Sequence, residues 1–303
     1  MIQTTAIIGM GALGLMYADT IAKARGRESV SFVMNKERLQ KYKDAVFTCN
    51  GEVKTFRMRD CEEMEPVDLL IVAVKYNGLP DAMKDMRKCV GENTIIMSVM
   101  NGITSEKMIA EEFGMEKLID TVAQGMDAMK FGSELRFTQM GELHIGVEAG
   151  QKQENVDAVA EFFDDIHMPY VVEEDILFRM WAKFMLNVGI NQTCMAYETT
   201  YSGALTEGTE ANDTLIAAMR EVITLSNAEN IGLTEKDLWL YIDILKTLDP
   251  EGVPSMRQDG IARRYSEVEM FAGTVIKMAE KHGIDTPANR LLYQKVKAIE
   301  ATY

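Results

Sequence analysis

Residues 4–14 read TTAIIGMGALG, and this stretch decides the fold that the sequence predicts. A short apolar strand over residues 4–9 leads directly into Gly9, Gly11 and Gly14, which match G-x-G-x-x-G, and apolar positions at helical spacing then continue towards Gly26. A tight turn alone would also use these glycines. A strand before the motif and a helix after it instead favour a dinucleotide site, in which the turn, the approach of a pyrophosphate and helix–strand packing each need one glycine. The residues assigned to this loop are Gly9, Met10, Gly11, Ala12, Leu13 and Gly14.

The end of the second strand indicates which dinucleotide binds. This strand covers residues 30–34, and the place where NAD-binding proteins usually carry an acidic residue holds Asn35 and Lys36, with Arg38 close behind. No carboxylate would repel a 2′-phosphate there, and the two cations could attract one. The sequence therefore favours NADP over NAD, although a solvated helix start would have the same composition.

Two further strands end in polar residues. Residues 67–74 (VDLLIVAV) form a continuous apolar run that ends at Lys75, and residues 94–99 form a second run that leads to Asn101. Ligands of open α/β sheets lie beyond the carboxyl ends of the parallel strands, so we expect both side chains near a cofactor or substrate. The alternatives are a lysine in a solvent loop and a turn residue beside Gly102.

The remaining pattern separates two domains. Strand-like runs at residues 118–124, 135–138 and 142–147, a helix near 154–166 and a last strand at 170–172 continue the α/β alternation, and Asn50-Gly51 predicts a β-hairpin. From residue 173 onwards helical spacing dominates, at 180–191, 215–231, 238–248, 261–279 and after Pro287. We predict an α/β dinucleotide-binding domain at residues 1–172 and an all-helical substrate or dimerisation domain at residues 173–303.

Residues 180–191, MWAKFMLNVGIN, place polar side chains on an apolar helix. Lys183, Asn187 and Asn191 stand four residues apart and therefore share one face. These three side chains either face solvent or face a ligand. The expected position of this helix near the interface of the two domains favours the ligand.

Composition excludes several classes of protein. The formal net charge is −15 over 303 residues, which disfavours binding to nucleic acid or to an anionic membrane. The four cysteines show neither zinc-ligand spacing nor a disulfide framework, so we expect no metal and a reducing, cytoplasmic environment. The sequence also shows no signal peptide and no membrane-spanning run.

Several motifs together resemble the ketopantoate reductase (2-dehydropantoate 2-reductase) family over essentially the whole chain. They are GMGALG at 9–14, VAVK at 72–75, Asn101-Gly102, W-x-K-x-x-x-N-x-x-x-N at 181–191 and SMRQDGIARRYSEVE at 255–269. The resemblance implies a Rossmann-type domain followed by a helical one. It also implies NADPH-dependent reduction of a 2-oxo acid, in the family's case ketopantoate to pantoate on the pantothenate and coenzyme A route.

The resemblance also implies roles for individual residues. Lys183 would be the general acid and Glu267 its partner, and the substrate site would contain Asn101, Asn187, Asn191, Ser255 and Asp259. Burial would lower the pKa of the lysine and Glu267 would raise it. By position alone, Glu267 could equally be a solvated residue flanking the helical stripe at 261–279.

Some positions depart from the family pattern, and they leave the substrate open. Asn35 stands where many members carry arginine, Gln192 where proline is frequent, Glu269 where aspartate is frequent and Ala272 where asparagine is frequent. The alternatives are therefore a dehydrogenase for another branched 2-oxo acid, one for a larger hydroxy acid or opine-like substrate, and a non-catalytic NADP(H)-binding sensor. A homodimer through the helical domain is a further expectation.

Overall fold

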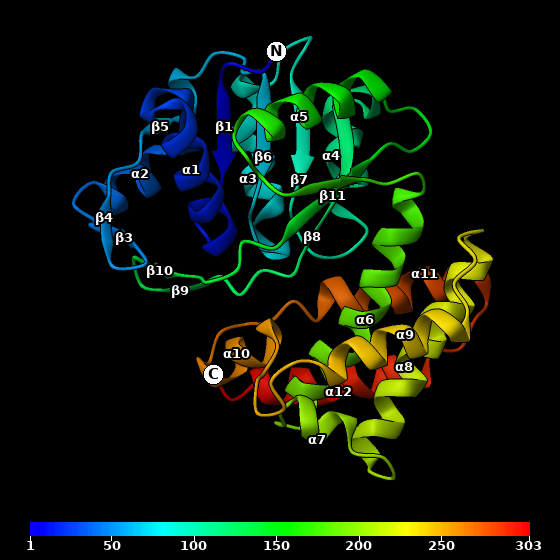
Figure 1. Cartoon of the computed structure of the whole chain (residues 1–303). Helices are drawn as coiled ribbons and strands as arrows, with labels where there is room; N and C mark the ends of the chain where they lie inside the picture. The colour runs from blue at the N-terminus through cyan, green and yellow to red at the C-terminus, as the bar shows by residue number, and fades with distance from the viewer. The chain divides into compact units, whose positions relative to one another are not determined.

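The computed structural model describes residues 1–303 in two compact units. The first comprises Met1–Asn101 with Ser105–Ile176, and the second comprises Gly102–Thr104 with Leu177–Tyr303. The first unit contains the β-sheets and the second is helical (Figure 1). The predicted α/β class, with a Rossmann-type part followed by a helical part, is confirmed. The separate cofactor and substrate roles of the two parts stay a prediction.

An eight-stranded sheet forms the centre of the first unit. In sheet order its strands are β12 (Tyr170–Val172), β11 (Glu142–Gly146), β8 (Leu118–Gln124), β7 (Ile95–Ser98), β6 (Leu69–Val72), β1 (Thr5–Ile8), β2 (Val30–Met34) and β5 (Met58–Asp60). Neighbouring strands are parallel except β8 and β11. The carboxyl ends of β1, β6 and β7 therefore meet at one edge.

Both faces of this sheet are buried, which explains the continuous apolar runs of its strands. Ile7 and Ile71 pack with helices α1 (Ala12–Arg25) and α5 (Gln153–Asp165). The alternate residues, Ile8 and Leu70, pack with α3 (Leu79–Met86) and α4 (Ser105–Phe113) on the other face. Figure 1 shows these helix pairs on opposite sides of the strands. Helix α2 (Lys36–Tyr42) and short 3₁₀ turns complete the connections.

A second, four-stranded sheet was only partly predicted. Its order is β4 (Glu52–Lys54), β3 (Phe47–Cys49), β10 (Glu134–Arg136) and β9 (Met129–Phe131). The hairpin between β3 and β4 is confirmed, and positive φ angles at Asn50 and Gly51 fit the expected type I′ turn. The run predicted at residues 135–138 pairs in this small sheet rather than in the main one, because β10 adds to β3 from far along the chain.

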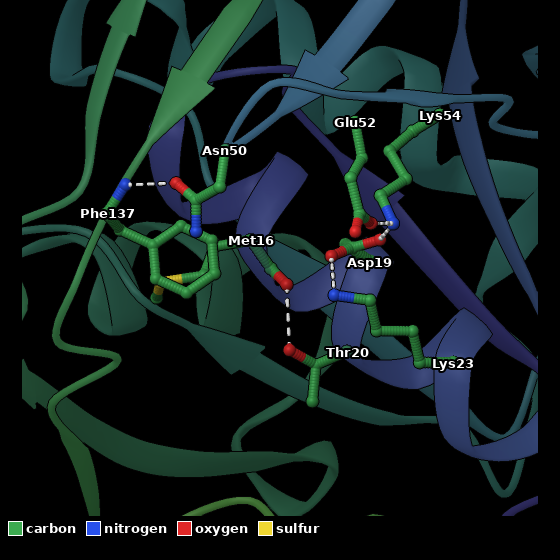
Figure 2. Close-up of polar contacts among 8 residues, drawn as sticks. All are labelled: Met16, Asp19, Thr20, Lys23, Asn50, Glu52, Lys54 and Phe137. Atoms are coloured by element: carbon green, nitrogen blue, oxygen red, sulfur yellow. Dashed lines mark hydrogen bonds and ion pairs between the residues drawn. The ribbon is translucent and has the colours of Figure 1, made fainter.

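Polar contacts hold the small sheet on helix α1 (Figure 2). The buried carboxylate of Asp19 lies 2.7 Å from Lys23 Nζ on its own helix and 3.5 Å from Lys54 Nζ on β4. Asn50 Oδ1 accepts the Phe137 N–H at 2.9 Å. Because Asp19 is buried, these two lysines supply the compensating charge that a buried carboxylate requires.

The helical unit has a separate apolar core. Its helices are α6 (Ile176–Ala196), α7 (Tyr201–Leu205), α8 (Glu210–Ala228), α9 (Glu235–Lys246), α10 (Ser255–Ile261), the π-helical turn η6 (Glu269–Gly273), α11 (Thr274–His282) and α12 (Pro287–Glu300). Met185, Leu215, Val275 and Leu292 are fully buried in it. None of the chain's helices has the length and hydropathy to cross a membrane.

The predicted continuous helix at residues 261–279 is wrong. Helix α10 ends at Ile261, the chain turns at Arg263 with a φ of 50°, and helical structure resumes only at η6. Ser266 donates its N–H and its hydroxyl to the buried Glu300 carboxylate on α12, at 2.7 and 2.6 Å. These tertiary bonds pull the segment off a helical path that its propensity would allow.

Two carboxyl groups are buried between β8 and α4 in the first unit. Burial, reinforced by the nearby Asp120, raises the pKa of Glu106 to about 8, and burial raises the pKa of Asp120 to about 7. Ser105 donates to Glu106 at 2.9 Å and Gln151 donates to Asp120 at 2.7 Å. Both carboxyls therefore hold protons in the folded chain at pH values where the unfolded chain is ionised.

This difference predicts a stability that falls with rising pH. Between pH 5 and 8 the folded state binds more protons than the unfolded state, so the free energy of unfolding decreases through that window. Glu106→Gln should remove part of the effect and stabilise the protein at pH 8.5 by roughly 1–3 kcal/mol. Urea unfolding at pH 6 and 8.5 measures this, and Glu111→Gln, on the exposed side of α4, is the control. An unchanged pH dependence in Glu106→Gln would contradict the assignment.

Candidate active site

The glycine loop joins β1 to α1, and two of its glycines are required by packing alone. A Cβ atom on Gly9 would lie 2.4 Å from the Ala73 carbonyl oxygen, and one on Gly14 would lie 2.1 Å from the Gly9 carbonyl oxygen. Gly9 also has a φ of 111°. Neither position accepts a side chain without movement of the backbone, whether or not a ligand binds.

Gly11 is different, and it is the position that points to a ligand. A Cβ there would meet only the Ala73 carbonyl oxygen, at an ordinary 3.7 Å, and its φ of −77° suits any residue. Gly11 is the N-cap of the 14-residue helix α1, and no side chain caps the helix. The free N–H groups and the space above Gly11 fit a pyrophosphate. Met10 is buried beneath the loop, while Ala12 and Leu13 begin the helix.

The residues after β2 occupy the place expected for a ribose phosphate. Asn35 is the N-cap of α2, and its Oδ1 accepts the Arg38 N–H at 3.0 Å. Lys36 is 80% exposed in its side chain, and its Nζ lies 3.7 Å from the buried carboxylate of Asp60 on β5. Asn35 thus serves the helix start, while the charged groups that remain for a 2′-phosphate are Lys36 and Arg38.

Lys75 and Asn101 follow adjacent parallel strands. Val72 of β6 pairs with Ser98 of β7, and both residues lie beyond that pair at the carboxyl edge where β1 and its glycine loop also end. Lys75 is exposed and Asn101 is half-buried. Both side chains therefore occupy the edge of the sheet where ligands of this architecture bind.

The polar line of α6 is a connected structure. Asn191 Nδ2 donates to Asn187 Oδ1 at 3.1 Å, and the two amides are 5% and 7% exposed. Asn187 Nδ2 is buried and has no hydrogen-bond partner in the chain. A buried N–H donor without a partner is costly, so this amide is ready to donate to a bound ligand.

Helix α10 joins this line. Asn191 Oδ1 accepts the Ser255 hydroxyl and the Met256 N–H, each at 3.4 Å. Asp259, one turn further along, is 5% exposed, and its Oδ1 accepts Arg264 Nε at 2.9 Å. The structure therefore brings Ser255 to the asparagines and ties Asp259 to an arginine that the sequence analysis did not identify.

Lys183 lies at the start of the polar line, and its charge is strongly perturbed. Burial lowers its pKa to about 8, Glu267 opposes the shift and Arg179 adds to it. Glu267 and Lys183 thus interact across the helical unit, although Glu267 precedes η6 rather than flanking a long helix. Arg179, one helical turn before Lys183, was missed, and its i−4 spacing was the available signal.

Gln192 was assigned no role, and it is fully buried beside Asn191. Its Oε1 accepts the Ala272 N–H at 2.9 Å. No group of three His, Cys, Asp or Glu side chains could hold a metal ion. The arrangement in the helical unit is thus a half-buried cation, a carboxylate and amide donors, which suits proton donation to an oxygen that gains negative charge.

Two family models match most of the chain. Residues 5–150 match the model described as ketopantoate reductase PanE/ApbA, and residues 175–300 match the model of its C-terminal part. The chain is 25% identical over 307 residues to the 2-dehydropantoate 2-reductase of Aquifex aeolicus, covering 99% of this chain and 98% of that protein. It is 24% identical to the same enzyme of Streptococcus pyogenes, with 97% of each chain covered.

Solved structures show the same fold. A ternary complex of D-mandelate dehydrogenase with NADH and anilino(oxo)acetate superposes with a TM-score of 0.85 at 21% identity, over 99% of this chain and 98% of that one. A dimeric ketopantoate reductase from Staphylococcus aureus superposes with a TM-score of 0.81 at 20% identity, over 99% of each chain.

The contrast between Gly11 and Gly14 yields a prediction. Gly11→Ala should keep the unfolding temperature of the wild type but weaken NADPH binding by about tenfold or more, because the methyl group occupies the space of the phosphates. Gly14→Ala should lower stability by about 1–3 kcal/mol through overpacking. Thermal unfolding and fluorescence titration with NADPH measure the two effects. Unchanged NADPH affinity in Gly11→Ala would contradict the role of this loop.

Proposed function

The chain belongs to the ketopantoate reductase family and is an NADP-dependent oxidoreductase, and from this premise we propose how its residues reduce ketopantoate to pantoate. The family and the reaction class agree with the sequence analysis. The assignment of individual side chains is our proposal. It depends on the half-buried Lys183, whose pKa is lowered by desolvation and raised by Glu267.

Lys183 is the proton donor in this proposal. Reduction of a ketone carbon leaves negative charge on the carbonyl oxygen, which an ammonium group can stabilise and then protonate. A pKa of about 8 keeps most of the lysine protonated at pH 7, yet makes it a far better acid than an ordinary lysine. Above pH 8 the lysine loses its proton, so the reduction slows.

Glu267 keeps the lysine charged and oriented. Its charge raises the pKa of Lys183 against the larger effect of burial, so removing it would lower the protonated fraction at neutral pH. Arg179 acts in the opposite direction. Burial, Glu267 and Arg179 together place the pKa of the donor near 8, close to neutral pH, where general acids are most effective.

The asparagines bind the substrate in this proposal. Asn187 offers its unpartnered Nδ2–H to an oxygen of the 2-oxo acid, and Asn191 holds Asn187 and Ser255 in place. Ser255 and Asp259 are further substrate groups of the helical unit in this proposal, and Asn101 is the substrate group of the first unit. Their hydrogen-bonding atoms match the carboxylate, carbonyl and hydroxyl groups of ketopantoate and pantoate.

The glycine loop and its neighbours bind the cofactor. NADPH, when bound, supplies the hydride for the reduction. The α1 N-terminus would hold the pyrophosphate, Lys36 and Arg38 the 2′-phosphate, and Lys75 and Asn101 the groups nearest the carboxyl edge of the sheet. Because the Lys36 ammonium also interacts with the Asp60 carboxylate, the preference for NADPH over NADH depends largely on Arg38 in this proposal.

A second candidate substrate is another branched 2-oxo acid. Gln192 and Ala272, the two positions named above as departures from the family pattern, share a hydrogen bond beside Asn191, which supports this second candidate. A non-catalytic sensor is less favoured, because Lys183 and Glu267 are both retained and interact.

A substrate panel with NADPH and NADH tests the proposal. Wild-type protein should oxidise NADPH on addition of ketopantoate, and Lys183→Ala should lower kcat by about 10²–10⁴ with little change in NADPH affinity. Lys277→Ala, on α11, is a matched control for the loss of a lysine. Full turnover by Lys183→Ala would exclude the proposed acid, and turnover with a different 2-oxo acid alone would select the second candidate.

We also propose a homodimer in the cytoplasm. The dimer is supported by the relative from S. aureus, which is described as dimeric. The cytoplasm is supported by the four free cysteines of this chain, which are usual in a reducing compartment. On α9, Leu240 and Ile244 are 57% and 43% exposed on one face. Two antiparallel copies of α9, related by an axis between residues 239 and 240, would set Lys236 opposite Asp243 of the partner.

A substitution that adds one charge to each copy of α9 tests the proposed dimer surface. Leu240→Glu should convert the dimer to a monomer, because it would place two carboxylates in the apolar part of the surface near the axis. Light scattering after size-exclusion chromatography measures the mass. Val53→Glu, which adds the same charge at a 69% exposed apolar residue, should stay dimeric. A monomeric wild type, or an unaltered mass for Leu240→Glu, would refute this surface.

A further inference from the structure

The turn η6 contains an extra residue relative to an α-helix. The Gly273 N–H donates to the Val268 carbonyl, five residues earlier, at 3.0 Å. In an α-helix the Val268 carbonyl would accept from Ala272 instead. The wider turn therefore leaves the Ala272 N–H without its usual partner, in a segment where Ala272 is fully buried.

Gln192 accepts this displaced N–H. Its Oε1 lies 2.9 Å from the Ala272 nitrogen, and the glutamine is itself fully buried. A buried N–H without an acceptor is strongly unfavourable. The side chain of Gln192 therefore stabilises the π-helical turn selectively over a regular α-turn, in which the backbone would satisfy Ala272 by itself.

The orientation of Gln192 is fixed by two more bonds. Its Nε2 donates to the Val188 carbonyl at 2.8 Å and to Asn289 Oδ1 at 3.2 Å. Asn289 Nδ2 in turn donates to Glu221 Oε2 at 2.7 Å. Because both partners of Nε2 are acceptors, the amide oxygen must face Ala272. The amide thus links α6, α8, α12 and η6.

The turn directly follows Glu267. The Glu267 carbonyl accepts the Met270 and Phe271 N–H groups at 2.9 and 3.1 Å, so the backbone of Glu267 enters the first turn of η6. Each residue of an α-helix turns the chain by about 100°. If the π-turn became an α-turn, the chain before it would rotate by about that angle relative to α11, and Glu267 would move with it.

We propose that Gln192 is a positioning residue that holds η6 in its π-helical form and thereby directs Glu267 at Lys183. This inference rests on the proposed roles of Lys183 and Glu267. Gln192 lies on the same helix as Lys183, so one helix carries both the donor and the group that positions the partner of the donor. π-Turns inside helices often occur at functional sites.

The test replaces the amide with a side chain of similar size that cannot accept the N–H. In Gln192→Met we expect the pKa of Lys183 to fall by about one unit or more, because Glu267 no longer raises it fully. NMR of ¹³C-lysine-labelled protein without substrate measures this pKa, with Lys183→Ala assigning the signal. Gln192→Asn, one methylene too short to reach Ala272, should shift the pKa in the same direction if Gln192→Met does not fold.

Kinetics provide the second readout. With ketopantoate, Gln192→Met should lower kcat tenfold or more and move the alkaline limb of the kcat profile to lower pH, while the KM for NADPH stays unchanged. Glu267→Gln removes the carboxylate charge altogether, so it gives the largest decrease in the pKa of Lys183 that we expect. If Gln192 has only a structural role, Gln192→Met will lower stability but change neither the pKa of Lys183 nor the alkaline limb of the kcat profile.

Asn289→Leu is the matched control within the same network. It removes the bond from Gln192 to α12 but leaves the bond from Ala272 to Gln192, so we expect lower stability with an unchanged Lys183 pKa. Ser226→Ala, a buried serine of α8 that accepts the Leu233 N–H, is a control for destabilisation elsewhere. An unshifted Lys183 pKa in Gln192→Met and Gln192→Asn would overturn the proposal.

The two readouts separate this inference from the proposed function. If the wild-type protein turns over no 2-oxo acid, the proposed function fails, yet the NMR measurement still decides whether Gln192 controls the interaction of Glu267 with Lys183. If turnover is normal and the pKa does not respond, the proposed function stands and Gln192 has only a structural role.

Discussion

The partial burial of the Lys183 ammonium, opposed by the charge of Glu267, is the interaction on which the proposed chemistry of the helical unit depends. Burial alone would drive the lysine towards its neutral form, and a free amine cannot protonate the product of ketone reduction. Glu267 offsets only part of that effect, and the resulting pKa of about 8 shows that desolvation is the larger contribution. The sequence analysis identified these two opposing effects. Their relative size depends on how deeply the side chain is buried, which is a tertiary property.

The buried amides of α6 form two hydrogen-bonded groups, and most of their partners lie on helices rather than loops. Asn191 joins α6 to α10, and Gln192 joins α6 to η6 and α12. Such networks are stable in a core only if nearly every donor has an acceptor. The unpartnered Nδ2 of Asn187 is therefore informative, because the amide nitrogens of Asn191 and Gln192 on the same helix both donate hydrogen bonds.

The structure gives a physical reason for two of the departures from the family pattern, Gln192 and Ala272. Gln192 and Ala272 lie 80 residues apart in sequence and share one hydrogen bond. A glutamine at position 192 supplies the acceptor that the N–H at position 272 needs. In the sequence alone these are two separate departures, since nothing in their spacing indicates that they meet.

Local sequence determined most elements of the first unit. The strands at residues 69–72 and 95–98 are recognisable in the sequence because a strand buried on both faces needs continuous apolar residues. The glycines of residues 9–14 are recognisable because the close approach of Gly14 to Gly9 excludes a side chain. Lys183, Asn187 and Asn191 were likewise found from spacing. Only the tertiary structure decided the break after Ile261, the small second sheet and the contacts of Gln192 with η6 and α12. Each depends on contacts between residues distant in sequence, such as Ser266 with Glu300, which override the helical spacing that the sequence displays.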